Sequence, residues 1–442
     1  MKRIITNTDV EFLTDEMKPA DFTGKRPVKA RLFEKASTGF MGFGVAITGS
    51  SCFLLNQVEK TERQALLRKI YGPDGLDFRM GRISIAASDY SAESYSYCDT
   101  PDDVELTHFS IDKDREYIIP MIREILTLQP DLFLLASPWT PPAWMKTNNS
   151  LFGGEMKREY LPVYAEYLIR FLKAYRDEGI VIRAITMQNE PETDQGGKMP
   201  QCKWAPELEA EFAGILSRRL KEENLPVEIW LHDHNYASLR PMKLLKAYPE
   251  LQKQVSGVAY HYYTGGPQDT LELQEAYPGL PCHFTEAGPR LDDNYEGAFC
   301  KWAIVVSEAL SCGFKSQIFW NLILDEEGKP TVGPFNCAGL FTRNHETGEI
   351  TFSGLYKALR HVAPYVTEKT KIYGVELPKS VCMRNFPPKY TPLYGLFSEN
   401  ESGESALLLV NAWEKEATVE FEYRGAVHQI VLSPNTVETI TF

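Results

Sequence analysis

The sequence predicts an α/β fold, a (β/α)8 barrel with an all-β sandwich appended to it. Eight short apolar runs alternate with longer amphipathic segments over roughly 320 of the 442 residues, which favours a closed parallel barrel over an open sheet. Helical periodicity ends near residue 365, and short strand-like runs separated by turn residues follow. An open nucleotide-binding sheet is disfavoured, because Gly42 to Gly44 does not continue into a G-x-G-x-x-G turn.

The predicted barrel strands are continuous apolar runs rather than alternating ones. Continuous runs of this length are typical of strands buried on both faces of a parallel sheet. The eight runs cover residues 43–48, 78–85, 132–136, 181–186, 227–231, 255–260, 283–285 and 317–320.

Between the runs, several segments have the 3.6-residue period of amphipathic helices. The clearest cover residues 160–175, 206–223 and 296–310. Gly179 follows the first of them and Pro206 begins the second, positions that these residues favour at helix ends. Asp112 and Asp114 begin a further helix, where their carboxylates face its positive end.

The chain divides into three predicted parts. Residues 1–40 are non-helical and polar at first, and we expect them to add strands to the sandwich. Residues 41–365 form the predicted catalytic barrel, and residues 366–442 form the predicted sandwich domain. Its strands are expected at residues 371–375, 393–397, 406–410, 418–421 and 428–432.

Composition excludes several function classes. The 47 basic and 60 acidic side chains leave a formal net charge of −13, which disfavours nucleic acids and anionic membranes as partners. No apolar run reaches the roughly 18 residues of a membrane span. The first residues turn polar without a signal-peptide core, so we expect a cytoplasmic protein. The eight cysteines lack any C-x-x-C spacing, and we expect them to be reduced and mostly buried.

Polar and aromatic residues follow nearly every predicted barrel strand. The active site of such a barrel lies at the C-terminal ends of its strands, so these residues are expected to meet at one rim. They include Asp89, Trp139, Asn189, Glu190, His234, Asn235, His261, Tyr263, Glu286 and Asn321.

Two of these residues, Glu190 and Glu286, end the fourth and seventh predicted strands. Taken singly, Glu190 fits a solvated loop and Glu286 fits a helix cap before Ala287. Together they match the pair of carboxyl groups that cleaves a glycosidic bond, and retention requires them about 5–5.5 Å apart. We expect burial and the charge of Glu286 to raise the pKa of Glu190.

No metal or organic cofactor is expected. His232 and His234 share one face of a strand, but the sequence offers no evident third metal ligand. A hydrogen bond to substrate from His234 or Asn235 is the favoured interpretation, with a structural role as the alternative. For His261 the same two interpretations, a hydrogen bond to substrate and a structural role, both stay open.

Several motifs closely resemble those of glycoside hydrolase family 30, the glucosylceramidase-like family. The strand-3 string SPWTPPAWMKT at residues 137–147 is the most specific of them. The other matching strings are GFGVAIT at 42–48, SDYS at 88–91, YSYCDT at 95–100, ITMQNEP at 185–191, FTEAG at 284–288 and WNLIL at 320–324.

The resemblance implies a role for each matching residue. Glu190 corresponds to the family's acid/base and Glu286 to its nucleophile. Asn189 corresponds to the residue that binds the sugar 2-hydroxyl, and Tyr263 to the tyrosine beside the nucleophile. Three further residues correspond to positions that line the sugar subsite, Asp89, Trp139 and Trp320. The family fold is a (β/α)8 barrel fused to a β-sandwich made from both chain ends.

The sequence departs from the family at two places. Gly49 follows Thr48 where the family usually has an acidic residue, and residues 193–203 form a loop of their own beside Glu190. The family's aglycone specificity is therefore not transferred to this chain.

The leading hypothesis is a retaining β-glycosidase acting on a β-linked glucoside or a related xyloside, fucoside or quinovoside. The alternatives are an endo-acting β-glucanase or xylanase of the same family and, in another class, a catalytically inactive carbohydrate-binding barrel. The last of these requires a lost carboxylate, and both are present.

Overall fold

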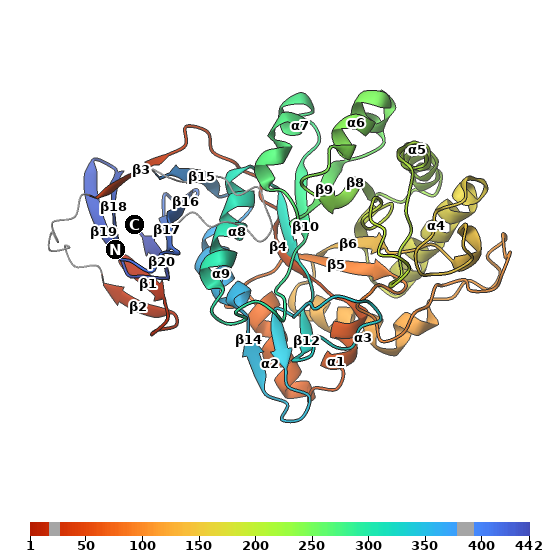
Figure 1. Ribbon diagram of the computed structural model, residues 1–442, viewed down its shortest axis with the longest axis horizontal. Helices are drawn as coiled ribbons and strands as arrows, with labels where there is room; N and C mark the ends of the chain where they lie inside the picture. Colours follow the sequence, from red (N-terminus) through yellow and green to blue (C-terminus); the bar gives the residue numbers. More distant parts are fainter. Residues whose placement is uncertain (17–26, 378–392) are drawn as a thin grey trace.

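The computed structural model describes residues 1–16, 27–377 and 393–442. Its larger part is a closed barrel of eight parallel strands, and all eight predicted runs are confirmed as its strands (Figure 1). In chain order the strands are β4 (Gly42–Ala46), β5 (Met80–Ile85), β6 (Phe133–Pro138), β7 (Ile182–Thr186), β8 (Glu228–Asn235), β9 (Gly257–His261), β10 (Cys282–Glu286) and β11 (Ser316–Phe319).

Helices connect successive strands on the outside of the barrel. They are α1 (Gly49–Leu55), α2 (Lys60–Tyr71), α3 (Asp112–Leu128), α4 (Leu161–Asp177), α5 (Pro206–Glu222), α6 (Arg240–Ala247), α7 (Leu271–Ala276), α8 (Phe299–Ser311) and α9 (Gly354–Val362). The predicted helices are confirmed as α3, α4, α5 and α8, although α8 begins three residues later than expected. A small sheet of β12 (Ile323–Asp325), β13 (Phe341–Arg343) and β14 (Ile350–Phe352) lies between β11 and α9 in the chain.

The first turn of α3 contains an exposed and a buried carboxylate. Asp112 is exposed, whereas Asp114 is buried and accepts hydrogen bonds from Tyr95, Tyr97 and Tyr175 at 2.5–2.6 Å. Burial raises the pKa of Asp114 although the three hydroxyls act to lower it. This carboxylate therefore ties the loop after β5 to α3 and α4, a contact that helix-end electrostatics alone does not predict.

The barrel interior is apolar at one level and polar at the next. Met80, Leu135, Ala184, Trp230, Ala259 and Ile318 form the apolar layer. Above it, toward the C-terminal ends, the strands contribute Arg82, Ser137, Thr186, Asp233 and Thr285, all buried and hydrogen-bonded to one another. Buried polar groups are stable only when they are paired in this way.

The all-β region uses strands from both ends of the chain. Nine strands pair in the order β19-β18-β3-β15-β16-β17-β20-β1-β2. Their bounds are β1 (Lys2–Thr6), β2 (Leu13–Glu16), β3 (Val28–Leu32), β15 (Lys371–Glu376), β16 (Leu393–Glu399), β17 (Ser405–Asn411), β18 (Ala417–Tyr423), β19 (Ala426–Leu432) and β20 (Thr436–Thr441). All five predicted C-terminal strands are confirmed, and β20 is an additional one.

A single apolar core packs between β18 and β19 at one end of this strand order and β17 and β20 further along it. It includes Val419 and Ile430 from one half and Leu407, Leu409 and Ile440 from the other. The first four residues of β15 pair with β16, and the next two pair with β3. The sheet therefore folds over on itself into a sandwich, whose other face packs on α8 and α9 of the barrel (Figure 1).

The cysteines agree with the sequence prediction where the structure describes them. Cys52, Cys98, Cys202, Cys282, Cys300 and Cys337 are buried, Cys312 is half-buried, and none of these seven forms a disulfide. Cys382 lies outside the described residues. Within the described ranges, the helices are too short or too polar to cross a membrane.

An ion pair ties the first strand to the last one. The Arg3 guanidinium donates to Glu438 Oε1 at 2.6 Å, and the Glu438 side chain is fully buried. Burial raises the pKa of Glu438, and the Arg3 charge acts against that rise. Without Arg3, a buried carboxylate would have no charge partner.

We predict that Arg3→Met lowers the free energy of unfolding by about 3 kcal/mol, the lower end for breaking a buried ion pair, because Arg3 is partly exposed. Urea denaturation measures this loss. The double variant Arg3→Met/Glu438→Leu should recover most of it, because it leaves no unpaired charge. Equal losses in the single and double variants would contradict the explanation.

Candidate active site

A single arginine inside the barrel connects the groups at the strand ends. Arg82 on β5 is fully buried and donates to Asn189 Oδ1 at 2.7 Å and to Asp233 Oδ2 at 2.8 Å. It also donates to Glu286 Oε2 and, through Nε, to Ser137 Oγ at 3.2 Å. Its positive charge and fork of donors fix these groups relative to one another. Sequence reasoning missed Arg82, although a charged residue inside an apolar run was a usable signal.

Glu286 ends β10 and is nearly buried, with 8% of its side chain exposed. Oε2 accepts from Arg82, and Oε1 accepts from the Tyr263 hydroxyl at 3.0 Å. Burial and the charge of Glu286 raise the pKa of Tyr263, so its hydroxyl stays a donor. The contact expected between Tyr263 and this carboxylate is thus present, and each oxygen of Glu286 accepts one hydrogen bond from a different side chain.

Glu190 lies beyond the end of β7 in a left-handed backbone conformation, with φ of 47°. Its Oε1 is 2.9 Å from His261 Nδ1 and 3.4 Å from His234 Nδ1, while Oε2 accepts from Thr193 Oγ1 at 3.3 Å. The backbone N–H of Glu190 donates to the Asp233 carbonyl at 3.0 Å, which fixes this unusual conformation. The result is a carboxyl group held from two strands and from the following loop.

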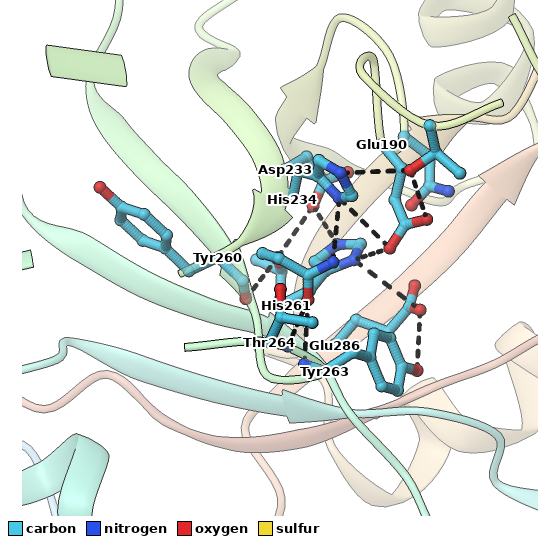
Figure 2. A network of polar contacts seen from close by, with 12 residues as sticks. Glu190, Asp233, His234, Tyr260, His261, Tyr263, Thr264 and Glu286 are labelled. Carbon is cyan, nitrogen blue, oxygen red and sulfur yellow. Dashed lines mark hydrogen bonds and ion pairs between the residues drawn. The ribbon is translucent and has the colours of Figure 1, made fainter. Parts of the chain in front are cut away.

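His261 lies between the two carboxyl groups (Figure 2). Its Nδ1 is 2.9 Å from Glu190 Oε1 and 3.8 Å from Glu286 Oε1. The two oxygens can therefore be no more than about 6.7 Å apart, the sum of those two distances. This limit on one pair of oxygens is compatible with the separation of about 5–5.5 Å between the carboxyl groups of retaining glycosidases.

The predicted rise in the pKa of Glu190 is wrong. Burial acts to raise this pKa, but the hydrogen bonds and charges of His234 and His261 outweigh burial and hold the pKa well below its usual range. Burial likewise acts to lower the pKa of His261, but the charge of Glu286 and the contacts with Asp233 and Glu190 raise it to about 9. The proton of this pair thus resides on His261 in the free protein.

A backbone bulge at Asp233 interrupts the regular alternation of side chains that was expected from the sequence for residues 232–235. His232 and Asp233 both have positive φ, 81° and 49°, and the β8–β9 register shifts between His232 and His234. This bulge turns Asp233 into the barrel, where it pairs with Arg82 and lies 3.1 Å from His261 Nε2. His232 is buried, and its Nε2 lies 3.2 Å from the Asn235 carbonyl oxygen.

Three other predicted subsite residues are buried near Arg82 or Glu286, namely Trp139, Trp320 and Asp89. Trp139 and Trp320 are buried and stacked, with ring centroids 5.3 Å apart, and the Arg82 guanidinium lies over both rings. Asp89 is buried, and its Oδ1 has no hydrogen-bond partner within the described residues. A buried acceptor of this kind is suited to a sugar hydroxyl.

At the first departure from the family pattern, next to Gly49, the loop of residues 330–333 supplies the contacts. Thr48 caps α1 and donates to Asn321 Oδ1 at 3.0 Å, and Ser50 donates to the Pro330 carbonyl at 2.7 Å. In the same loop, the backbone N–H groups of Val332 and Gly333 donate to the carbonyl oxygen of Asp89, at 2.8 and 3.1 Å. The backbone of residues 330–333 thus supports Asp89 on the side where Gly49 offers no acid.

The second departure, the loop of residues 193–203, is held by a buried lysine. Lys146 Nζ donates to Thr140 Oγ1 and to the carbonyls of Leu151 and Gln201 at 2.6–2.9 Å. Burial lowers its pKa to about 8. Met199 of this loop belongs to the same apolar cluster as Trp139 and Trp320. The loop therefore extends from the Glu190 side to the stacked tryptophans.

Comparisons with known sequences and with solved structures agree on one protein family. A model described as the glycosyl hydrolase family 30 TIM-barrel domain matches residues 40–336. Putative glucosylceramidase 4 of Caenorhabditis elegans is 24% identical over 454 residues, which cover 95% of this chain and 85% of the relative. Lysosomal acid glucosylceramidase of Mus musculus is 30% identical over 323 residues, 67% of this chain and 62% of the relative. The solved structure of the endo-β1,6-glucanase BT3312 has a TM-score of 0.84 at 25% identity and covers 100% of this chain and 99% of its own.

The barrel, its paired carboxyl groups and these matches define a retaining β-glycosidase. The chain belongs to glycosyl hydrolase family 30.

We predict that Arg82→Lys lowers kcat/KM by about 10²–10³-fold, the loss typical of removing a preorganised donor, because an ammonium cannot reproduce a guanidinium that donates to four side chains. Steady-state kinetics on an aryl β-glycoside measures this change. Arg79→Lys is the matched control, since Arg79 is exposed and, within the described residues, its guanidinium pairs with Asp77. Less than a threefold loss in Arg82→Lys would contradict the assigned importance of the fork.

Proposed function

We propose that this enzyme hydrolyses a β-linked glucoside or a related glycoside, with Glu286 as nucleophile and Glu190 as acid/base. The observation that carries this proposal is the placement of both carboxyl groups around one imidazole nitrogen, with Arg82 and Tyr263 on Glu286 and two histidines on Glu190. One carboxyl group thus accepts from a guanidinium and a phenol hydroxyl, and the other contacts two imidazoles.

The first step breaks the glycosidic bond. The Glu286 carboxylate attacks the anomeric carbon, the bond to the leaving oxygen breaks, and a covalent glycosyl-enzyme forms. In this proposal Asn189, whose Oδ1 accepts from Arg82, binds the 2-hydroxyl, and the stacked Trp139 and Trp320 form an apolar wall beside the sugar ring. Water then attacks the same carbon from the side the leaving group occupied, and the configuration is retained.

The proton for the leaving oxygen comes from the Glu190–His261 pair. His261 holds it in the free enzyme, and Nδ1 is 2.9 Å from Glu190 Oε1. As negative charge develops on the leaving oxygen, the proton moves from His261 Nδ1 to Glu190 Oε1, and Oε1 passes that same proton to the leaving oxygen. In the second step Glu190 accepts a proton from water and the pair regains its starting state.

A glucoside is favoured because several relatives are named glucosylceramidases or endo-1,6-β-glucanases. Between an exo-acting and an endo-acting enzyme, burial favours the first. Asp89, Trp139 and Trp320 are each less than 5% exposed, and the loop of residues 330–333 closes over Asp89. The second candidate, an endo-acting β-1,6-glucanase, is favoured by the full-length structural similarity to an enzyme of that name.

A panel of aryl β-glycosides, together with β-1,6-linked gluco-oligosaccharides, tests the proposed substrate. We expect the highest kcat/KM on the β-glucoside and single-sugar release from oligosaccharides. Release of internal fragments from a β-1,6-glucan would support the endo-acting candidate. No turnover of β-glucosides, β-xylosides, β-fucosides or β-quinovosides would contradict the proposal.

We predict a basic limb in the pH profile of kcat/KM near pH 9, because His261 carries the required proton and its pKa is raised to about 9. His261 is charged below that pH, and activity falls as the pH rises through it. In His261→Gln the limb should move down by more than one pH unit, since Glu190 must then hold the proton itself. His108→Gln, an exposed histidine, is the control. An unmoved limb in His261→Gln would assign it to another group.

We predict that Glu190→Ala retains formation of the glycosyl-enzyme from substrates with good leaving groups and loses it with poor ones, because only poor leaving groups need protonation. Pre-steady-state bursts with dinitrophenyl and methyl β-glycosides measure the difference. Equal losses on both substrates would contradict the role of Glu190.

A further inference from the structure

We propose that Glu190, His234 and His261 form an inhibitory binding site for a divalent transition-metal ion such as Zn²⁺. Among the described residues, their ligating atoms all lie within 4.8 Å of one another. The binding itself stands on this geometry alone, whereas its effect on activity rests on the proposed role of Glu190.

Two of the three donor spacings are close to what a zinc ion needs, and the third pair of donors lies within 4.8 Å. Bonds of about 2.0–2.2 Å in tetrahedral geometry place neighbouring ligand atoms roughly 3.3–3.6 Å apart. Glu190 Oε1 is 3.4 Å from His234 Nδ1, which fits directly, and 2.9 Å from His261 Nδ1, which opens slightly when an ion replaces the hydrogen bond. The third ligand, His261 from β9, is the one that the sequence reading of His232 and His234 lacked.

Both imidazoles are oriented by contacts at their other ring nitrogen. His261 Nε2 is 3.1 Å from Asp233 Oδ1, and Asp233 is itself ion-paired with Arg82. His234 Nε2 is 3.1 Å from Thr193 Oγ1. In a neutral imidazole, an Nε2–H that donates to such an acceptor leaves the Nδ1 lone pair for a metal ion, and at His261 the ion displaces the proton that faces Glu190. Figure 2 shows both rings turned toward Glu190.

The donor set selects a class of ion. Two imidazoles and one carboxylate suit Zn²⁺, Cu²⁺ or Ni²⁺, whereas Mg²⁺ and Ca²⁺ prefer oxygen ligands only. Glu190 and His234 keep 14% and 11% of their side chains exposed, so a fourth position is open to water. The leaving oxygen of a substrate must approach the same carboxyl group, so ion and substrate exclude each other.

Zinc inhibition of the wild-type enzyme on an aryl β-glucoside tests this site. We expect ZnCl₂ to raise the apparent KM without changing kcat, EDTA to reverse the effect and MgCl₂ to have none. In His234→Asn the inhibition constant should rise by more than the roughly 10–100-fold that loss of an outer-shell partner costs. His345→Asn, which removes an exposed histidine paired with Glu326, should leave it unchanged.

Cobalt absorption provides a readout independent of turnover. Co²⁺ should give a tetrahedral spectrum without a thiolate charge-transfer band, and His234→Asn should abolish it. A thiolate band that disappears in Cys337→Ser, equal inhibition of wild type and His234→Asn, or activity that requires a divalent ion would each overturn the proposed site. Cobalt bound at these residues without inhibition would overturn the competition and, with it, the proposed role of Glu190, whereas failure to bind leaves that role intact.

Discussion

The buried ion pair between Arg82 and Asp233 is the contact on which the site depends. Both side chains are completely inaccessible, inside a barrel whose next layer is apolar. Two isolated charges there would be strongly unfavourable, and their pairing offsets that cost because further hydrogen bonds engage both side chains. Arg82 reaches Glu286 and Asn189 as well, and Asp233 accepts from Ser137, Thr186 and Thr285.

This arrangement lets two carboxyl groups share a small volume. The negative charges of Glu190 and Glu286 repel each other. The positive charge of Arg82, which donates to Glu286, and that of His261, which lies between the two carboxyl groups, offset this repulsion. Asp233 then stabilises the charge of His261 from its other nitrogen. The acid/base that we propose is therefore a carboxyl–imidazole pair with one proton rather than a single carboxyl group with a raised pKa.

Much of the fold follows from the sequence because buried parallel strands are continuous apolar runs. The last strand, β20, was missed because its sequence contains Glu438, and its burial beside Arg3 depends on the distant β1. The start of α8 was placed too early because residues 296–298 have no cap residue that marks the boundary. The folding of the sheet over itself is also hard to predict, because β15 pairs with two strands, β3 and β16, that are far apart in the sequence.

The site was predictable where a residue follows a strand, as Glu190 and Glu286 do. It was not predictable where backbone geometry redirects a side chain, as the bulge at His232 and Asp233 does. The pKa of Glu190 was predicted in the wrong direction for a related reason. Its sign depends on His234 and His261, which come from two other strands and converge on one oxygen.

Trapping of the covalent intermediate tests the central claim most directly. A 2-deoxy-2-fluoro-β-glucoside with a good leaving group should inactivate the enzyme with time and add one fluorosugar per chain. Peptide mass spectrometry should place that sugar on Glu286. A label on Glu190 or on any other residue, or turnover of the same compound with inversion at the anomeric carbon, would contradict the account.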